Sequence, residues 1–462
     1  MPPIIFQSSL SIDKRAFRRD LFPILTFAVF GTVFSAVVIG VLTHKMTSWG
    51  TGATLPLLDS LLFGSLISSI DPVATLGILG GAGVVQTDTL YVLIFGESLL
   101  NDGVAIVLFD TLVEHLGDAA VVDKATIHEC ITSFLKVTCC SVAIGLACGI
   151  VCTIYFWALR KKHTAVTEVA IFFCWALIPF YISDGIGFSG IISIMTMGFF
   201  LDYYVIGGSQ SEEDQWMEYM AMRDAGEQAL PVATRQFSKV FSGVGHLSSK
   251  SKHHVGFVAE VVASIVETAI FAYLGIFLFN DKHFWDMRLN ATAVIGCIIS
   301  RGLMVAMFSL VVNFFVWLDF ENRVWRVCCP QRIVNDDEDS VDSRRFNHKY
   351  LDRSTQRILL LAGVRGAVSF ALVENIPVYN AVRKTGSQLK AELKGMTGAS
   401  ILFTVFVFGA LTHYLVKKEK ENNTGEIVGT LSHRLLDTPL DSDNDEEGSA
   451  SFLVELESAS SN

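Results

Sequence analysis

The 462-residue chain carries 46 acidic and 35 basic residues, for a formal net charge of -11, and charged residues make up only 18% of the sequence. Soluble domains carry about a quarter charged residues. Together with a mean hydropathy of +0.47, this composition excludes an ordinary soluble domain, predicts a protein embedded in a lipid bilayer, and gives no sign of a nucleic-acid partner.

Apolar stretches follow one another along the chain at lengths that can cross a bilayer. A cytoplasmic start at 1–21 precedes a transmembrane domain at 22–418, and a short acidic tail at 419–462 is expected to be disordered. Two long cytoplasmic loops are expected at 207–254 and 319–355. The ten predicted spans are 22–43, 55–81, 89–114, 131–159, 165–182, 186–206, 255–279, 291–318, 356–374 and 396–416. The predicted fold class is an all-α polytopic membrane protein.

Basic residues are concentrated in alternate loops, which predicts how the chain is oriented. One side holds the start of the chain, Arg160–Lys162, the loop at 319–355 and the residues after Lys417. The other side holds few basic residues, with the loop before the last span as the exception. Both termini are therefore expected in the cytoplasm.

Six ionisable residues fall inside the predicted spans. A charge near the bilayer centre costs at least about 2.5 to 3.5 kcal/mol, so such residues are candidates for function. They are Asp71, Glu97, Asp102, Glu267, Arg301 and Arg365. Charges near span ends, such as Glu114, Glu168 and Asp184, can reach the interface and are interpreted as solvated.

The segment Phe95–Gly103 places several polar side chains in the middle of one span. On a helix Glu97 and Asn101 share one face, and Ser98 and Asp102 share the adjacent face. Such a cluster must line protein or water and not lipid. A buried hydrogen-bond network that joins helices is the alternative to a functional site.

Two other spans are interrupted near their middle. Pro72, after Asp71, removes an amide hydrogen and breaks one helix, and Gly363 and Gly366 flank Arg365 in another. Each break falls in the second span of a set of three, the sets beginning at 22 and 291, and the two sets are oppositely oriented. This pattern predicts an inverted repeat whose broken helices meet at an ion site near the bilayer midplane.

A lone buried charge is destabilising, so each buried arginine needs an acidic partner. We expect Arg301 to pair with Glu97, and Arg365 to pair with Glu267. Asp102 then remains as a carboxylate without a fixed counter-charge, and it is able to take a cation or a proton.

Five motifs occur in order: Pro2-Pro3-Ile4-Ile5-Phe6, Asp71-Pro72-Val73-Ala74, Phe95 to Asp102, Glu267 to Gly275, and Arg365-Gly366-Ala367. With them the chain resembles the eukaryotic sodium/proton exchanger family of monovalent cation:proton antiporters, in the branch with an Asn-Asp pair, from Pro2 to about Lys418. The resemblance implies an inverted-repeat antiporter fold with two discontinuous crossing helices, a homodimer, and an elevator-like movement of a six-helix bundle.

The resemblance also assigns the site. Asp102 is expected to carry the transported Na+ or K+, with Asn101 as its neutral neighbour and with Asp71 and Ser98 contributing to the site. The pair of Glu97 and Arg301 is expected to stabilise the mobile bundle. No cofactor is expected beyond the transported ions.

Two departures from the family pattern bear on assembly. The family has thirteen spans, and this chain begins where the third ends, so residues 1–21 are interpreted as the remnant of a preceding helix. Gln7 stands where many members have Glu. The missing helices belong largely to the dimer scaffold, so the ion site is expected to be intact.

The sequence therefore predicts an electroneutral antiporter that exchanges Na+ or K+ for H+ and regulates pH and cation content. The choice between Na+ and K+ stays open. A non-transporting partner subunit of a full-length exchanger and a cation channel are the alternatives. Within the family, the segment Phe271–Gly275 resembles organellar members, which implies Golgi, endosomal or vesicle membranes ahead of the plasma membrane.

Overall fold

The computed structural model describes residues 2–12, 14–49, 54–71, 75, 89–116, 124–159, 164–207, 245–278, 285–317, 351–379 and 386–418. Contacts divide the chain into one unit that ends at His413 and a second that begins at Tyr414. In the described residues the first unit is built from helices, with one isolated β-bridge between Val378 and Ser387.

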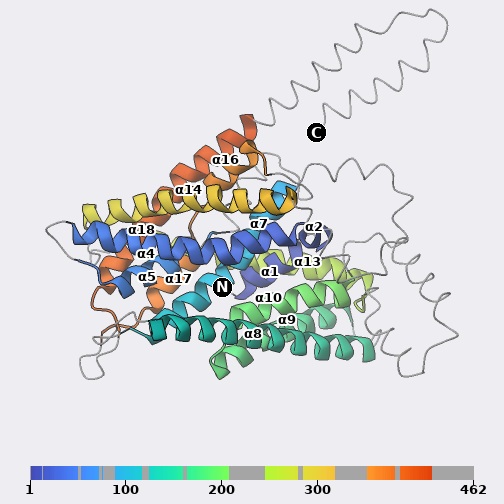
Figure 1. Cartoon of the computed structure of the whole chain (residues 1–462). Helices are drawn as coiled ribbons and strands as arrows, with labels where there is room; N and C mark the ends of the chain where they lie inside the picture. The colour runs from blue at the N-terminus through green and yellow to red at the C-terminus, as the bar shows by residue number, and fades with distance from the viewer. Residues whose placement is uncertain are drawn as a thin grey trace, which may run out of the picture. The chain divides into compact units, whose positions relative to one another are not determined.

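The helices have the following bounds in chain order (Figure 1), with π-helical turns marked η. They are α1 Pro2–Ser11, α2 Lys14–Arg19, α3 Leu21–Leu25, η1 Thr26–Gly31, α4 Thr32–Ser48, α5 Leu57–Ser68, α7 Thr89–Glu114, α8 Lys124–Ala158, α9 Ala165–Ile186, α10 Gly190–Leu201, η2 Asp202–Ile206, α13 Ser249–Leu278, α14 Met287–Trp317, α16 Arg353–Leu361, α17 Ala367–Asn375, α18 Lys390–Phe403 and η5 Thr404–Phe408.

The predicted fold class is confirmed. Within the described residues 7 helices are long and apolar enough to cross a membrane, and Leu57–Ser68 and Gly190–Ile206 are shorter apolar helices. The remaining predicted span, 356–374, is the pair α16 and α17 on either side of a break. The protein is an integral multi-pass membrane protein with all ten predicted spans represented.

Some predicted boundaries are corrected by a few residues. α8 begins at Lys124, α13 at Ser249 and α18 at Lys390, each before the apolar stretch starts, because polar residues continue the helix beyond the hydrocarbon core. Most of the two predicted loops, at 208–244 and 318–350, lies outside the described residues, as does the predicted tail at 419–462.

The helices form two groups within the first unit. In one, α4 packs on α5 and α14, α14 packs on α16 and α18, and α17 packs on α5 and α18. In the other, α10 packs on α8 and α9, and α1 packs on α10 and α13 (Figure 1). We call the first group, together with α7, the crossing bundle, and the second the side bundle. The crossing bundle consists of the six spans that the sequence assigned to the two repeats.

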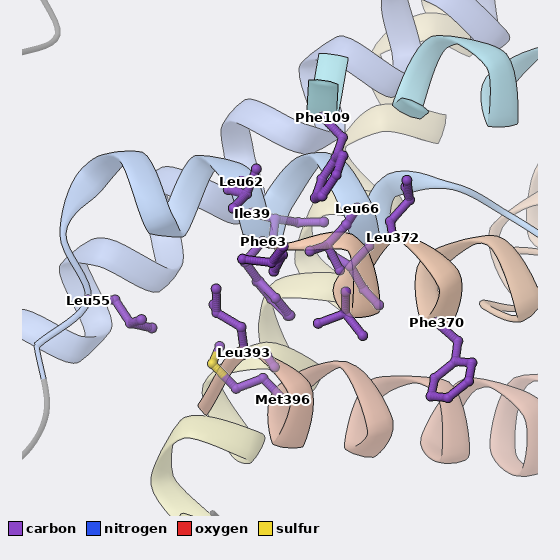
Figure 2. Close-up of a cluster of buried hydrophobic side chains, with 14 of the residues drawn as sticks. Ile39, Leu55, Leu62, Phe63, Leu66, Phe109, Phe370, Leu372, Leu393 and Met396 are labelled. Carbon is purple, nitrogen blue, oxygen red and sulfur yellow. The ribbon is translucent and has the colours of Figure 1, made fainter. Parts of the chain in front are cut away.

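Each bundle has its own apolar core, and α7 contributes to both. Figure 2 shows the core of the crossing bundle, where side chains from α4, α5, α7, α17 and α18 meet. Leu99 of α7 packs instead with Phe6, Phe172 and Met197 in the core of the side bundle. The apolar window of α7 is accordingly 89% buried inside the protein, against 17% for α13. The polar residues in the middle of α7, from Glu97 to Asp102, therefore lie away from lipid.

Glycines bring α4 and α5 into backbone contact. A Cβ at Gly64 would overlap the carbonyl oxygen of Ala36, and a Cβ at Gly40 would lie 2.8 Å from the Cα of Leu61. Small residues that allow such close approach are typical of tightly packed membrane helices. The contact fixes α5, which leads to the first break, against α4.

We predict that Gly64→Ala destabilises the protein by about 1 to 3 kcal/mol, because the added methyl group meets backbone atoms that cannot move aside. Thermal unfolding of the purified protein in detergent measures this effect. Gly185→Ala is the matched control, since a Cβ there meets nothing within 4 Å. Equal melting temperatures for Gly64→Ala and wild type would contradict the predicted contact.

Candidate ion-binding site

The polar segment of α7 is an uninterrupted stretch of helix in the middle of the protein. Glu97, Ser98, Asn101 and Asp102 are all buried, with at most 2% of each residue exposed. Helical spacing places Glu97 with Asn101 and Ser98 with Asp102 on neighbouring faces, as the sequence predicts. The structure thus brings all four residues into one buried layer.

The first crossing helix breaks beside this layer. α5 ends at Ser68, and Ser69 is extended. The amide of Ile70, which has left the helix, donates a hydrogen bond to Asn101 Oδ1 over 3.3 Å. Pro72, which the sequence identified as the cause of the break, lies outside the described residues. The side chain of Asn101 therefore supports the broken backbone and not only its neighbour Asp102.

The second crossing helix breaks at the same place and binds the first. α16 ends at Leu361 and α17 begins at Ala367, with Gly363 and Gly366 in the non-helical segment between them. The Asp71 amide donates to the Val364 carbonyl over 2.8 Å, and the Thr75 hydroxyl donates to the Ala362 carbonyl over 3.1 Å. Backbone groups freed by one break are thus satisfied by the other.

Gly366 is required because the Asp71 carboxylate lies against it. A Cβ at position 366 would overlap Oδ2 of Asp71. Gly366 directly precedes α17, so the carboxylate lies at the amino-terminal end of that helix. The partial positive charge of a helix amino terminus favours a negative group there.

Two buried arginines cap the carboxyl-terminal ends of the broken helices. Arg365 donates from Nη1 to the carbonyls of Ser68, over 2.5 Å, and Ser69, over 3.0 Å, at the end of α5. Arg301 donates from Nη2 to the Leu359 carbonyl, over 2.7 Å, near the end of α16. The last carbonyls of a helix lack partners within it and carry partial negative charge, so a cation stabilises them.

Arg301 also forms the predicted ion pair with Glu97. Nη1 and Nη2 of Arg301 donate to the two carboxylate oxygens of Glu97, and each side chain is only 2% exposed. Gly363 makes room for the pair, since a Cβ there would lie 2.9 Å from Nε of Arg301. The pair connects α7 to α14, and through Leu359 to α16.

The predicted pair of Glu267 and Arg365 is not formed in the described part of the structure. Among the described residues no ion pair joins them, and Arg365 is instead held by the carbonyls at the end of α5. Glu267, on α13, is half-buried and interacts electrostatically with Asp71. The prediction matched charge with charge and overlooked that a broken helix end is itself an anionic partner.

Asp102 stays without a fixed counter-charge in the described part of the chain. Its Oδ1 atom has no hydrogen-bond partner there, nor do Ser98 Oγ and Asn101 Nδ2. Asp71 is near enough to interact with Asp102 electrostatically. A buried carboxylate in this state is costly unless a cation or a proton neutralises it.

The fully buried charges of the described site, a set that leaves out the half-buried Glu267, add up to one surplus negative charge. Arg301 and Arg365 supply two positive charges, and Glu97, Asp71 and Asp102 supply three negative charges when ionised; all five are buried. One monovalent cation or one proton restores neutrality. The site can therefore bind a cation or a proton, and binding of one neutralises the charge that would attract the other.

Sequence reasoning missed the hydroxyl groups that hold the breaks. Thr75 donates to Ala362, Ser69 and Ser369 share a hydrogen bond between hydroxyl oxygens 3.0 Å apart, and Thr404 accepts from the Arg365 amide. Hydroxyls are common on membrane helices and usually bond to their own helix. Only their position opposite a break distinguishes these, and the sequence does not give it.

Comparison with known proteins agrees with this architecture. The family model described as "Sodium/hydrogen exchanger, transmembrane" matches residues 1–224 and 239–418. Sodium/hydrogen exchanger 8 of Rattus norvegicus is 26% identical over 422 residues, which cover 90% of this chain and 60% of that protein. Sodium/hydrogen exchanger 9 of the same species is 27% identical over 421 residues, which cover 89% of this chain and 53% of that protein.

A solved structure is similar in fold. The sodium proton antiporter MjNhaP1 from Methanocaldococcus jannaschii superposes with a TM-score of 0.56 at 14% sequence identity, covering 90% of this chain and 83% of that chain. At this identity the likeness concerns the fold alone. The present chain spans about half to three fifths of the length of the curated relatives above.

We predict that Glu97→Gln and Arg301→Gln each destabilise the protein by about 3 to 5 kcal/mol, because each leaves an uncompensated charge in the core. The double variant, which removes both charges, should cost clearly less than the sum of the two. Thermal unfolding in detergent gives the three values.

Glu114→Gln serves as the control on the same helix, at its exposed end, and should change stability little. Additive effects in the double variant would show that the two side chains do not interact.

Proposed function

Because the chain belongs to the sodium/hydrogen exchanger family, we propose that it exchanges a monovalent cation, Na+ or K+, for a proton across its membrane. Asp102 is the group that carries either ion. The surplus of one buried negative charge is the observation on which the proposal rests. A site with that charge needs one cation or one proton, and never both.

Competition for one carboxylate couples the two fluxes in this scheme. Burial penalises the bare carboxylate, so Asp102 is occupied whenever the site is closed to water. Asn101 is neutral, and Glu97 is neutralised by Arg301. Only Asp102 changes its charge state, so one cation replaces one proton and the exchange is electroneutral.

The coordination chemistry supports a monovalent metal cation as cargo. Oxygen atoms are the preferred ligands of hard cations, and Asp102 Oδ1 and Ser98 Oγ are buried oxygens with no partner among the described residues. Asp71 lies near enough to add its own charge. Asn101 has its oxygen engaged by Ile70, so we assign it to holding the break and not to the cation.

We further propose a homodimer with both termini in the cytoplasm, located in Golgi, endosomal or vesicle membranes. The orientation rests on the loops rich in Lys and Arg. The compartment rests on the family resemblance of the segment Phe271–Gly275. Fluorescence microscopy of the tagged chain beside organelle markers tests the compartment, and a plasma-membrane signal would contradict it.

We predict that Asp102→Asn abolishes exchange, since an amide can neither release a proton nor attract a cation by charge. Purified protein is placed in liposomes that enclose a pH-sensitive dye, and addition of NaCl or KCl should change the internal pH only with wild-type protein. Asp110→Asn is the matched control, two turns along the same helix and exposed; it should retain exchange. Full exchange by Asp102→Asn would refute the assignment.

We also predict that the rate of Na+-driven proton movement is independent of membrane potential. A gradient of the membrane-permeant anion thiocyanate, at equal Na+ and K+ across experiments, sets the potential, which is worth about 2.3 kcal/mol for each net charge moved through 100 mV. One-for-one exchange moves no net charge. A rate that follows the imposed potential would contradict electroneutrality, and current without proton movement would indicate a channel.

A further inference from the structure

The hydroxyl of Thr404 lies opposite the second break. Thr404 is the first residue of the π-helical turn η5, which follows α18, and it is buried. Its Oγ1 atom accepts a hydrogen bond from the Arg365 amide over 3.0 Å. The Arg365 amide lies in the non-helical segment between α16 and α17, where the regular helical acceptor is lost. We propose that Thr404 is a positioning residue for the ion site, a role that rests on the proposed function.

Thr404 has a counterpart in the other half of the crossing bundle. The first break is held by Asn101, whose oxygen accepts from the Ile70 amide over 3.3 Å. Asn101 lies on α7, the third span of the first set, and Thr404 lies on the third span of the second set. In both sets the third span supplies a side-chain oxygen to the broken backbone of the second. Asn101 and Thr404 therefore each accept a hydrogen bond from a free amide at the break of one crossing helix.

The hydrogen bond from the Arg365 amide to Thr404 matters because the side chain of Arg365 holds the end of the other broken helix. The guanidinium of Arg365 caps the Ser68 and Ser69 carbonyls at the end of α5. The amide of Arg365 is fixed by Thr404, so Thr404 determines where this buried positive charge is held. A shift of the Arg365 backbone would move the charge relative to Asp71 and Asp102 and weaken cation binding. Thr404 thus acts on the site through Arg365 and touches no ion.

A second threonine on the same helix offers a matched comparison. Thr397, seven residues earlier on α18, is also buried, and its hydroxyl donates to the Leu393 carbonyl over 2.8 Å. The Thr404 hydroxyl likewise donates within its own helix, to the Ser400 carbonyl over 2.9 Å. Among the described residues the difference is the amide that Thr404 accepts from another helix. Removing the Thr397 hydroxyl therefore loses only a hydrogen bond within the helix, whereas removing the Thr404 hydroxyl also loses the hydrogen bond between helices.

The test compares Thr404→Val, which keeps the shape and removes the hydroxyl, with Thr404→Ser, which restores the hydroxyl, and with Thr397→Val. Hydrogen–deuterium exchange of the purified protein is followed in the peptide that contains Arg365. We expect Thr404→Val to speed exchange there about fivefold, as loss of one hydrogen bond implies. Thr404→Ser and Thr397→Val should stay within about twofold of wild type.

The functional measurement is cation-dependent proton movement in liposomes over a range of cation concentrations. The apparent KM for the cation should rise about fivefold in Thr404→Val and return toward the wild-type value in Thr404→Ser. Thr397→Val should leave it unchanged.

Two results would overturn the inference. One is hydrogen–deuterium exchange at Arg365 that is unaltered in Thr404→Val; the other is altered hydrogen–deuterium exchange there with an unchanged KM for the cation. If wild-type protein moves no ions, the proposed function fails. The hydrogen–deuterium exchange rate at Arg365 then decides alone whether Thr404 holds the break.

Discussion

The fold depends on how the free backbone groups of its two broken helices find hydrogen-bond partners where water is excluded. Every backbone N–H and C=O inside a membrane protein needs a partner within the protein, and two interrupted helices leave several of them free. Here the breaks supply each other, through the bond from the Asp71 amide to the Val364 carbonyl. The two remaining helix ends are capped by Arg301 and Arg365. The two buried arginines of the site thus satisfy backbone carbonyls as well as balancing charge.

The same constraint explains which sequence predictions succeeded. Span positions followed from hydropathy, since a bilayer demands long apolar stretches. The breaks followed from the glycines around Arg365, and the pair of Glu97 and Arg301 from the need to compensate buried charge. The spans and the breaks follow from residue type and spacing along the chain and required no knowledge of which helix lies beside which. The partner of Arg301 was inferred from charge alone.

What the sequence could not supply was the partner of each polar group across helices. Arg365 was matched with Glu267 because a carboxylate is visible in a sequence, whereas a helix end that acts as an acceptor is not. Arg365 instead donates to the carbonyls of Ser68 and Ser69, because α5 ends beside its guanidinium. Thr404 was overlooked for a similar reason, since its acceptor role depends on the Arg365 amide becoming free on another helix.

The single surplus negative charge has a consequence for leakage. In an exchanger, a carrier that returns empty dissipates one gradient without building the other. With Asp102 ionised and unoccupied, the buried layer would carry an uncompensated charge, and moving it through the apolar contacts between the crossing bundle and the side bundle would be slow. Slippage would then be suppressed by electrostatics, and tight coupling would require no separate gate.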